Sequence, residues 1–310
     1  MHDVVRMTAL ARLAVLAIIA PTALSLSGCG DTPEARAAQA KVVRTQRIQE
    51  FQKRLALADA NPEKAVTVAE WIMPSSLREI SGLVLTPRGT VFTHDDNVGR
   101  VSEIDPKTGI LLKSFSLSGL QKGDFEAIAT AGQDMYLLES SGKLFKFHEA
   151  ADGMQVPFTI YDTKLGKQCE FESLVYQADS SRLLMACKRL MDKNEVHELR
   201  IYQLPLPLGD RSAITMMRIP MDEVKGNNKW KNFRASDMCI DPLTGNIVVI
   251  AGREKAYVVL TPDGDVVRSE PLPGDHRQAE GIAITKDSLM IVSDEANGAP
   301  PKISVYRWHP

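Results

Sequence analysis

The chain has little net charge, few aromatic residues and few cysteines. Its formal net charge is −2 over 310 residues, and 6% of its residues are aromatic. This net charge gives the chain no basic footprint of the kind that nucleic-acid-binding proteins carry, and its aromatic residues do not alternate with Arg or Lys. We expect no nucleic-acid partner. The four cysteines show no CxxC or Cys/His spacing of the kind that binds zinc.

The common catalytic motifs are also missing. The sequence contains no Gly-x-Ser-x-Gly elbow and no glycine-rich phosphate loop. His94 precedes Asp95, which permits an acid/base interpretation, but such neighbours are common by chance. His148, His197 and His276 fall in unrelated positions. The sequence therefore does not identify a catalytic residue.

Long hydrophobic runs are confined to the N-terminus. Arg6 and Arg12 form a basic region, and residues 13–26 are apolar. The next residues, Leu26-Ser27-Gly28-Cys29, resemble the lipobox of bacterial lipoproteins. We therefore predict a lipoprotein signal peptide over residues 1–28 and lipidation of Cys29, including palmitate. The alternatives are a plain cleaved signal peptide and an uncleaved anchor.

This anchor fixes the expected location of the protein. No later segment is apolar enough to span a bilayer, so the mature chain is expected to attach to the membrane through its N-terminal lipid. Gly30 after the cysteine favours the outer membrane, with the protein facing the periplasm, although Asp31 weakens that assignment.

Residues 29–62 read as the lipidated cysteine and a helical linker. Thr32 suits an N-cap, Pro33 suits the first helical position, and Asn61-Pro62 ends the helix. Either this helix is a stalk that packs lightly on the domain, or it binds a partner. The folded domain is then residues 63–310.

That domain contains one motif five times. The copies start at intervals of 45, 46, 64 and 44 residues, and each is followed by a turn and a second apolar strand. They are Ser81-Gly82-Leu83-Val84-Leu85, Glu126-Ala127-Ile128-Ala129-Thr130, Glu172-Ser173-Leu174-Val175-Tyr176, Ser236-Asp237-Met238-Cys239-Ile240 and Glu280-Gly281-Ile282-Ala283-Ile284. Repeats of this length made of short strands predict an all-β, five-bladed β-propeller.

The last blade has only three strands of its own, so we predict that Ala65–Met73 adds as its outer strand and closes the ring. In blade two the outer strand is expected at Val156–Tyr161. The 64-residue interval leaves a six-bladed alternative, but Asp192–Val196 and Asp222–Phe233 look like polar insertions.

Three strings carry a resemblance to a known family. They are Asp124-Phe125-Glu126-Ala127-Ile128, Cys169-Glu170-Phe171-Glu172-Ser173-Leu174 and Gln278-Ala279-Glu280-Gly281-Ile282-Ala283. Together they resemble the SdiA-regulated (YjiK-like) bacterial proteins from about residue 66 onward. The resemblance implies a five-bladed propeller related to NHL-repeat proteins, bound calcium, and no established enzymatic activity.

A propeller brings equivalent residues of all blades together around one axis. The first residue of each repeat and the residue two positions earlier share a face, which predicts a ring of carboxylates. Calcium is the favoured ion, because it accepts six to eight oxygen ligands. The predicted metal ligands are Glu126, Glu172, Glu280, Glu79 and Asp124. The alternative is that these carboxylates only accept hydrogen bonds from neighbouring blades, which is the role we expect for Asp237.

Other residues have two open interpretations. Charged residues end the second strands, either to stabilise turns or to form a binding surface at one mouth of the channel: Asp95, Asp96, Glu139, Lys188, Arg253, Asp294 and Glu295. Cys169 and Cys187 form either a disulfide or two buried thiols, and Cys239 is expected in the core.

The expected function is that of a lipid-anchored envelope propeller that binds calcium in its channel. Its channel mouth would bind a protein or a small-molecule ligand without catalysis. The alternative is a calcium-dependent hydrolase, lactonase- or phytase-like, in which Lys188, Arg189, Arg234, Arg253 or Arg277 holds an anionic substrate.

Overall fold

The structure, a computed structural model, describes residues 32–191 and 197–310. The predicted signal peptide, the predicted lipidation site Cys29 and the segment Asp192–Val196 lie outside the described residues. The chain divides into two compact units, Met1–Lys41 and Val42–Pro310. Helix α1 (Pro33–Asp59) crosses that boundary, and its start is capped as expected by Thr32, whose Oγ1 accepts a hydrogen bond from Ala35 N at 3.2 Å.

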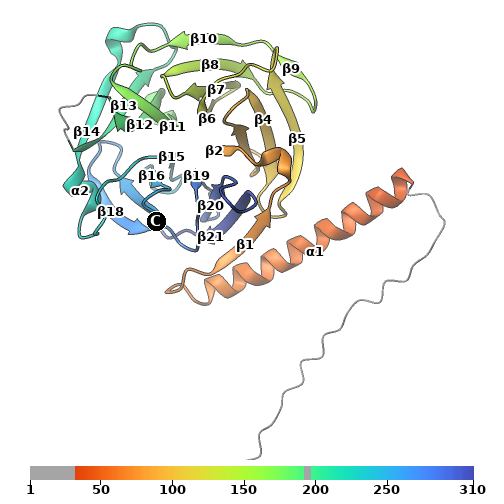
Figure 1. Ribbon diagram of the computed structural model, residues 1–310. Coiled ribbons are helices and arrows are strands. Elements are labelled where there is room, and N and C mark those ends of the chain that lie inside the picture. Colours follow the sequence, from red (N-terminus) through yellow and green to blue (C-terminus); the bar gives the residue numbers. More distant parts are fainter. Residues whose placement is uncertain (1–31, 192–196) are drawn as a thin grey trace, which may run out of the picture. The chain divides into compact units, whose positions relative to one another are not determined.

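The described residues of the larger unit form five sheets around one axis (Figure 1). Their innermost strands carry the five repeats: β2 (Ile80–Leu85), β6 (Phe125–Ala131), β11 (Cys169–Gln177), β15 (Asp237–Ile240) and β19 (Ala279–Ile284). This confirms the all-β, five-bladed propeller. The long interval after the third repeat is filled instead by an outer strand of blade three and by the short helix α2 (Met221–Lys225).

The outer strands follow the innermost ones in chain order. Blade one adds β3 (Val91–Asp95), β4 (Arg100–Asp105) and β5 (Ile110–Leu117). Blade two adds β7 (Asp134–Glu139), β8 (Lys143–His148) and β10 (Thr159–Asp162). Blade three adds β12 (Arg182–Leu190), β13 (Glu198–Pro205) and β14 (Thr215–Pro220). Blade four adds β16 (Ile247–Ala251), β17 (Ala256–Leu260) and β18 (Val266–Pro271), and blade five adds β20 (Leu289–Asp294) and β21 (Lys302–Arg307).

The outer strand predicted for blade two at Val156–Tyr161 is confirmed only in its second half, at β10, because Val156 belongs to another strand. Strand β9 (Gln155–Val156) pairs parallel with β5 of blade one, whereas β10 pairs antiparallel with β8 of blade two. Pro157 separates the two, and proline has no N–H to donate to a continuous ladder. The segment therefore links two neighbouring blades.

Blade five is completed from the other end of the domain. Strand β1 (Thr67–Ile72) pairs antiparallel with β21, with Trp71 opposite Ile303, which confirms the predicted closure. Closing the ring in this way removes an exposed sheet edge.

The second half of α1 packs against the closing strand. Arg54 Nε donates a hydrogen bond to Thr67 O at 2.9 Å, and the Arg47 guanidinium lies 5.1 Å from the centre of the Trp71 ring. Phe51 and Ala58 of the same helix half are buried in the core shared with β1 and blade one. The compact unit thus begins at Val42 and includes part of the segment that we read as a linker.

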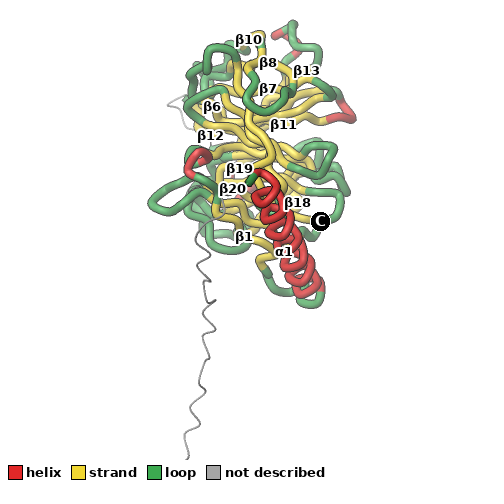
Figure 2. Tube along the Cα trace, turned by 90° about the vertical axis from the view of Figure 1, so that its right-hand side faces the viewer, coloured by secondary structure: helices red, strands yellow, loops and turns green. Residues whose placement is uncertain are grey.

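Side chains between the blades form the core. Strand β16, for example, is buried at all five positions because neighbouring blades cover both of its faces. Loops and turns lie on two opposite faces of the ring (Figure 2). Among the described residues, no helix is both long and apolar enough to cross a membrane.

Candidate metal centre at the channel mouth

A polar cavity of about 170 Å³ lies at one end of the central channel. Its lining residues are Glu79, Ser81, Asp96, Glu126, Glu172, Lys188, Gln278, Glu280 and Glu295. Four of the five predicted ligands are therefore brought together. The fifth, Asp124, does not line the cavity: it is exposed, and its carboxylate accepts a hydrogen bond from Ser140 Oγ.

Local backbone irregularities place the repeated glutamates at the channel. The pairing of innermost and second strands shifts register at Glu126, at Glu172 and at Glu280. Such β-bulges redirect the side chain of the extra residue. The first residue of these repeats therefore leaves the ladder at the channel, which the period-two alternation alone does not reveal.

Glu172 differs from the other glutamates of the ring because it has a close counter-ion. Lys188 Nζ, at the end of β12 in the same blade, forms an ion pair with Glu172 Oε1. The Glu172 side chain is only 4% exposed, whereas that of Lys188 is 36% exposed. The negative charge of Glu172 is thus balanced without a metal.

A tighter acidic cluster lies on blades one and five. One carboxylate oxygen from each of Glu79, Asp96 and Glu295 lies within 4.8 Å of the others. Backbone hydrogen bonds hold this arrangement, from Asp96 N to Glu79 O at 3.2 Å and from Ala296 N to Arg78 O at 2.9 Å. The second bond joins the loop after β20 to the loop before β2, so the cluster spans the junction between blades five and one.

The pKa values in this cluster are raised. Burial, a hydrogen bond with the Glu79 carboxyl group and the charges of nearby carboxylates raise the pKa of Glu295 to about 8. Burial, followed by the charge of Glu79, raises the pKa of Asp96 to about 6. The exposed Arg78 pairs with Glu79 at 2.9 Å, but a surface ion pair of this kind compensates little.

The pKa values of two more buried glutamates, Glu126 and Glu280, are also raised. Burial and then the charge of Asp124 raise the pKa of Glu126 to about 8, although Lys188 acts in the opposite direction. Burial likewise raises the pKa of Glu280, again opposed by Lys188. These groups together hold more negative charge than the nearby cations balance.

The donor set fits a hard divalent cation. Calcium binds oxygen at about 2.3–2.6 Å, so two ligands on opposite sides of the ion lie at most about 5 Å apart. The 4.8 Å limit within the Glu79, Asp96 and Glu295 cluster meets that requirement. None of the nine residues that line the cavity is His or Cys, which zinc or copper would favour.

Asp96 and Glu295 were read from the sequence chiefly as turn residues. Each follows an aspartate that does stabilise local structure: Asp95 Oδ1 accepts from Asn97 N and Val98 N, and Asp294 Oδ2 lies 2.6 Å from His276 Nδ1. The sequence feature that could have identified Asp96 and Glu295 as site residues is that each is the second of two adjacent acids, in Asp95-Asp96 and Asp294-Glu295. One member of each pair supports the loop while the other lines the cavity.

Asp237 is a structural acceptor, as predicted. Its buried Oδ2 accepts from Leu83 N at 3.1 Å and from Ile282 N at 2.9 Å, which links blade four to blades one and five. Burial raises the pKa of Asp237 well above its ordinary value. The His94 ring is also buried, and its Nδ1 lies 3.3 Å from the backbone oxygen of Asp95, so these neighbours form no acid/base pair.

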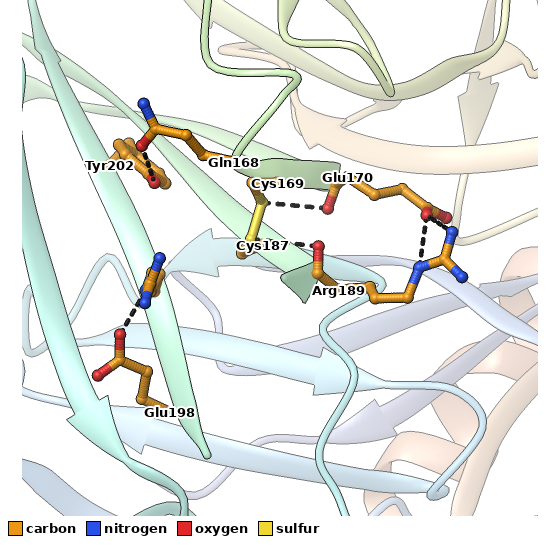
Figure 3. The surroundings of a disulfide bond; sticks show 8 residues. Gln168, Cys169, Glu170, Cys187, Arg189, Glu198 and Tyr202 are labelled. Atoms are coloured by element: carbon orange, nitrogen blue, oxygen red, sulfur yellow. Dashed lines mark hydrogen bonds and ion pairs between the residues drawn. A yellow bond between two sulfur atoms is a disulfide. The ribbon is translucent and has the colours of Figure 1, made fainter. Parts of the chain in front are cut away.

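Blades three and four give the mouth a different character. Cys169 and Cys187 form a disulfide that joins β11 to β12, and Cys239 is a buried free thiol. Figure 3 shows Glu170 and Arg189 beside the disulfide, joined by an ion pair. A second cavity of about 190 Å³ lies here, lined by Glu170, Lys188, Arg189, Arg234 and Arg253.

The solved structures that resemble this chain have little sequence identity to it. The glutaminyl cyclase of Myxococcus xanthus matches with 13% identity and a TM-score of 0.52, over 79% of this chain and 97% of that one. The PQQ-bound aldose sugar dehydrogenase of Streptomyces coelicolor matches with 11% identity and a TM-score of 0.51, over 77% and 98%. The calcium-binding protein regucalcin of Agrobacterium tumefaciens matches with 12% identity and a TM-score of 0.45, over 77% and 93%. At these identities the likeness concerns the fold alone.

No curated protein matches the chain in sequence. A family model does match, over the last two blades and the strand before them. This model is that of the SdiA-regulated family, its match covers residues 213–307, and it confirms the resemblance that the repeat motifs indicated.

Proposed function

We propose that this protein is a lipid-anchored propeller of the bacterial cell envelope that binds calcium at its channel mouth and offers that mouth to a ligand without catalysis. The observation that carries the proposal is the convergence of Glu79, Asp96 and Glu295, whose carboxylate oxygens lie within 4.8 Å of one another. Burial, followed by interactions with neighbouring carboxylates, raises the pKa values of Asp96 and Glu295, and a bound cation would relieve this conflict.

Calcium at this position would be held by side chains from two blades. Glu79 and Asp96 belong to blade one, and Glu295 belongs to blade five. The ion would replace the repulsion between carboxylates at the junction of blades one and five with attraction, and so stabilise the ring. It would also supply a fixed positive charge, open to an oxygen atom of a ligand.

Glu126 and Glu280 lie in the same cavity, and Glu172 faces Lys188. Our proposal therefore gives Glu126 and Glu280 a supporting role, in which they increase the negative potential near the ion, whereas Lys188 balances the charge of Glu172. Asp124, which is outside the cavity, contributes only through its charge.

A calorimetric calcium titration of the purified protein, with elemental analysis, tests this proposal. Glu79→Gln and Glu295→Gln are expected to weaken calcium binding by about tenfold or more. Glu170→Gln is the matched control, because Glu170 occupies on blade three the repeat position that Glu79 has on blade one, but pairs with Arg189. Equal calcium affinity in all three variants, or no binding by the wild type, would reject the calcium site.

The non-enzymatic part of the proposal has its own test. The hydrolase alternative requires calcium-stimulated turnover of lactones or phosphate esters that Glu280→Gln abolishes. We expect no such turnover, and its detection would replace the binding role with a catalytic one.

The anchor rests on the lipobox of the sequence, Leu26-Ser27-Gly28-Cys29. We propose that the lipid on Cys29 holds the protein at the outer membrane, facing the periplasm. Cys29→Ser is expected to move the protein from the membrane fraction to the soluble fraction after export. Unchanged fractionation, together with no incorporation of labelled palmitate in the wild type, would contradict lipidation.

A further inference from the structure

The second cavity at the channel mouth is strongly cationic. Four cationic side chains line its volume of about 190 Å³, against one carboxylate. The carboxylate is Glu170, which accepts hydrogen bonds from Nε and a terminal nitrogen of Arg189. The cavity thus keeps an excess of positive charge after its internal pairing.

Two arginines account for much of this excess. Arg253 is exposed and makes no hydrogen bond or ion pair with any other residue that the structure describes. A guanidinium nitrogen of Arg234 lies 3.9 Å from Glu254 Oε1, which is a loose contact. Both guanidinium groups can therefore donate to a bound anion.

The remaining cations are held in place. The Cys169–Cys187 disulfide fixes the end of β12 to β11, directly before Lys188 and Arg189 (Figure 3). Lys188 lines both this cavity and the acidic cavity. The two cavities therefore adjoin at Lys188, so an anion in the basic cavity would lie beside the acidic cavity that holds the proposed calcium site.

We propose that the basic cavity binds a phosphate group, and that the ligand of the channel mouth is a phosphorylated molecule whose phosphate is shared by Arg234, Arg253 and the calcium ion. The proposal rests on calcium binding as the proposed function. Guanidinium groups form strong, directional hydrogen bonds to phosphate oxygens.

Phosphate suits the site better than a carboxylate does. A phosphate dianion offsets more of the positive charge, and its oxygens point in several directions, so arginines and calcium on different sides can be contacted together. The cavity has several times the roughly 30 Å³ that one water occupies, but it is smaller than the about 300–1,000 Å³ of sites that enclose a whole ligand. It would hold the phosphate while the rest of the ligand stays outside.

Calorimetry on the full chain tests this inference, with glycerol phosphate as the probe, with calcium and with a chelator. We expect binding in calcium that weakens in chelator. The Arg234→Gln/Arg253→Gln double variant is expected to bind the probe at least about tenfold more weakly, while it binds calcium, without the probe, at least as tightly as the wild type does. Arg182→Gln is the matched control. Arg182 lies at the end of β12 away from Lys188, does not line the basic cavity, and donates a hydrogen bond to Gln203.

The outcomes separate this inference from the calcium proposal. Calcium binding by the wild type without glycerol phosphate binding would overturn the phosphate site and leave the calcium site intact. No calcium binding, with glycerol phosphate binding that needs the two arginines, would overturn the shared site and retain the anion pocket. Wild-type affinity for the probe in the double variant, or equally tight binding of acetate, would overturn the phosphate assignment.

Discussion

Two halves of one channel mouth carry opposite charge, although both are built from the same repeat. On blade three, the two acids that face the mouth each have a cation on the neighbouring strand, Glu170 with Arg189 and Glu172 with Lys188. On blades one and five, burial and then the neighbouring carboxylates raise the pKa values of Asp96 and Glu295. The counter-charge at the end of the second strand therefore decides which acids are free to bind a metal.

The largest expected effect comes from removing the counter-charge on blade three. Lys188→Met leaves the buried Glu172 unpaired, which we expect to lower the free energy of unfolding by about 3 kcal/mol. Denaturant unfolding of the calcium-free protein measures this loss. Lys188→Arg is the control, since it keeps the charge. A loss no larger than that of the control would show that the pair does not distinguish blade three.

A second prediction concerns how stability depends on pH, which the acidic half of the channel mouth should control. In the calcium-free protein, the pKa of Glu126 and that of Glu295 are about 8, against an ordinary 4.5. Between these values the native state keeps protons that the unfolded state has released, so stability is expected to fall as pH rises from about 4.5 to 8. Thermal unfolding at a series of pH values measures this slope.

Bound calcium should oppose this loss of stability at high pH. Calcium at 100 times its dissociation constant would add about 2.7 kcal/mol of stability, or roughly 5–10 °C in Tm. We expect the full shift near pH 8 and a smaller one near pH 5, where protons compete for the same carboxylates. A calcium shift that is equal at both pH values would mean that these acids are not the ligands.

The smallest effect is expected at Asp124. This residue was a predicted ligand, but it is exposed and lies outside the cavity. Asp124→Asn should change the free energy of unfolding by no more than about 0.5 kcal/mol and should leave the calcium affinity near that of the wild type. A loss of calcium binding comparable to that of Glu295→Gln would extend the site onto blade two.

The sequence revealed the fold more fully than the site. Repeat spacing and turn residues were sufficient for the five blades, and the missing fourth strand of blade five pointed to the segment that contains β1. The split at Pro157 was missed because Val156 and Tyr161 fit one alternating strand, and only the neighbouring blade explains why they separate.

The site was predicted only in part because the repeat marks the innermost strands alone. It identified Glu79, Glu126, Glu172 and Glu280 as channel residues. Asp96 and Glu295 follow second strands, where acids usually stabilise turns, and only the loops that join blades one and five bring them to Glu79. The pairing of Lys188 with Glu172 likewise depends on the hairpin of blade three, which no repeat spacing encodes.

A crystal structure of the calcium-loaded protein, with the ion located by its anomalous scattering, tests the central claim most directly. The account predicts one peak within bonding distance of Glu79, Asp96 and Glu295, at the junction of blades one and five. A peak bound instead by Glu172 beside a displaced Lys188, or no peak in the channel, would contradict it.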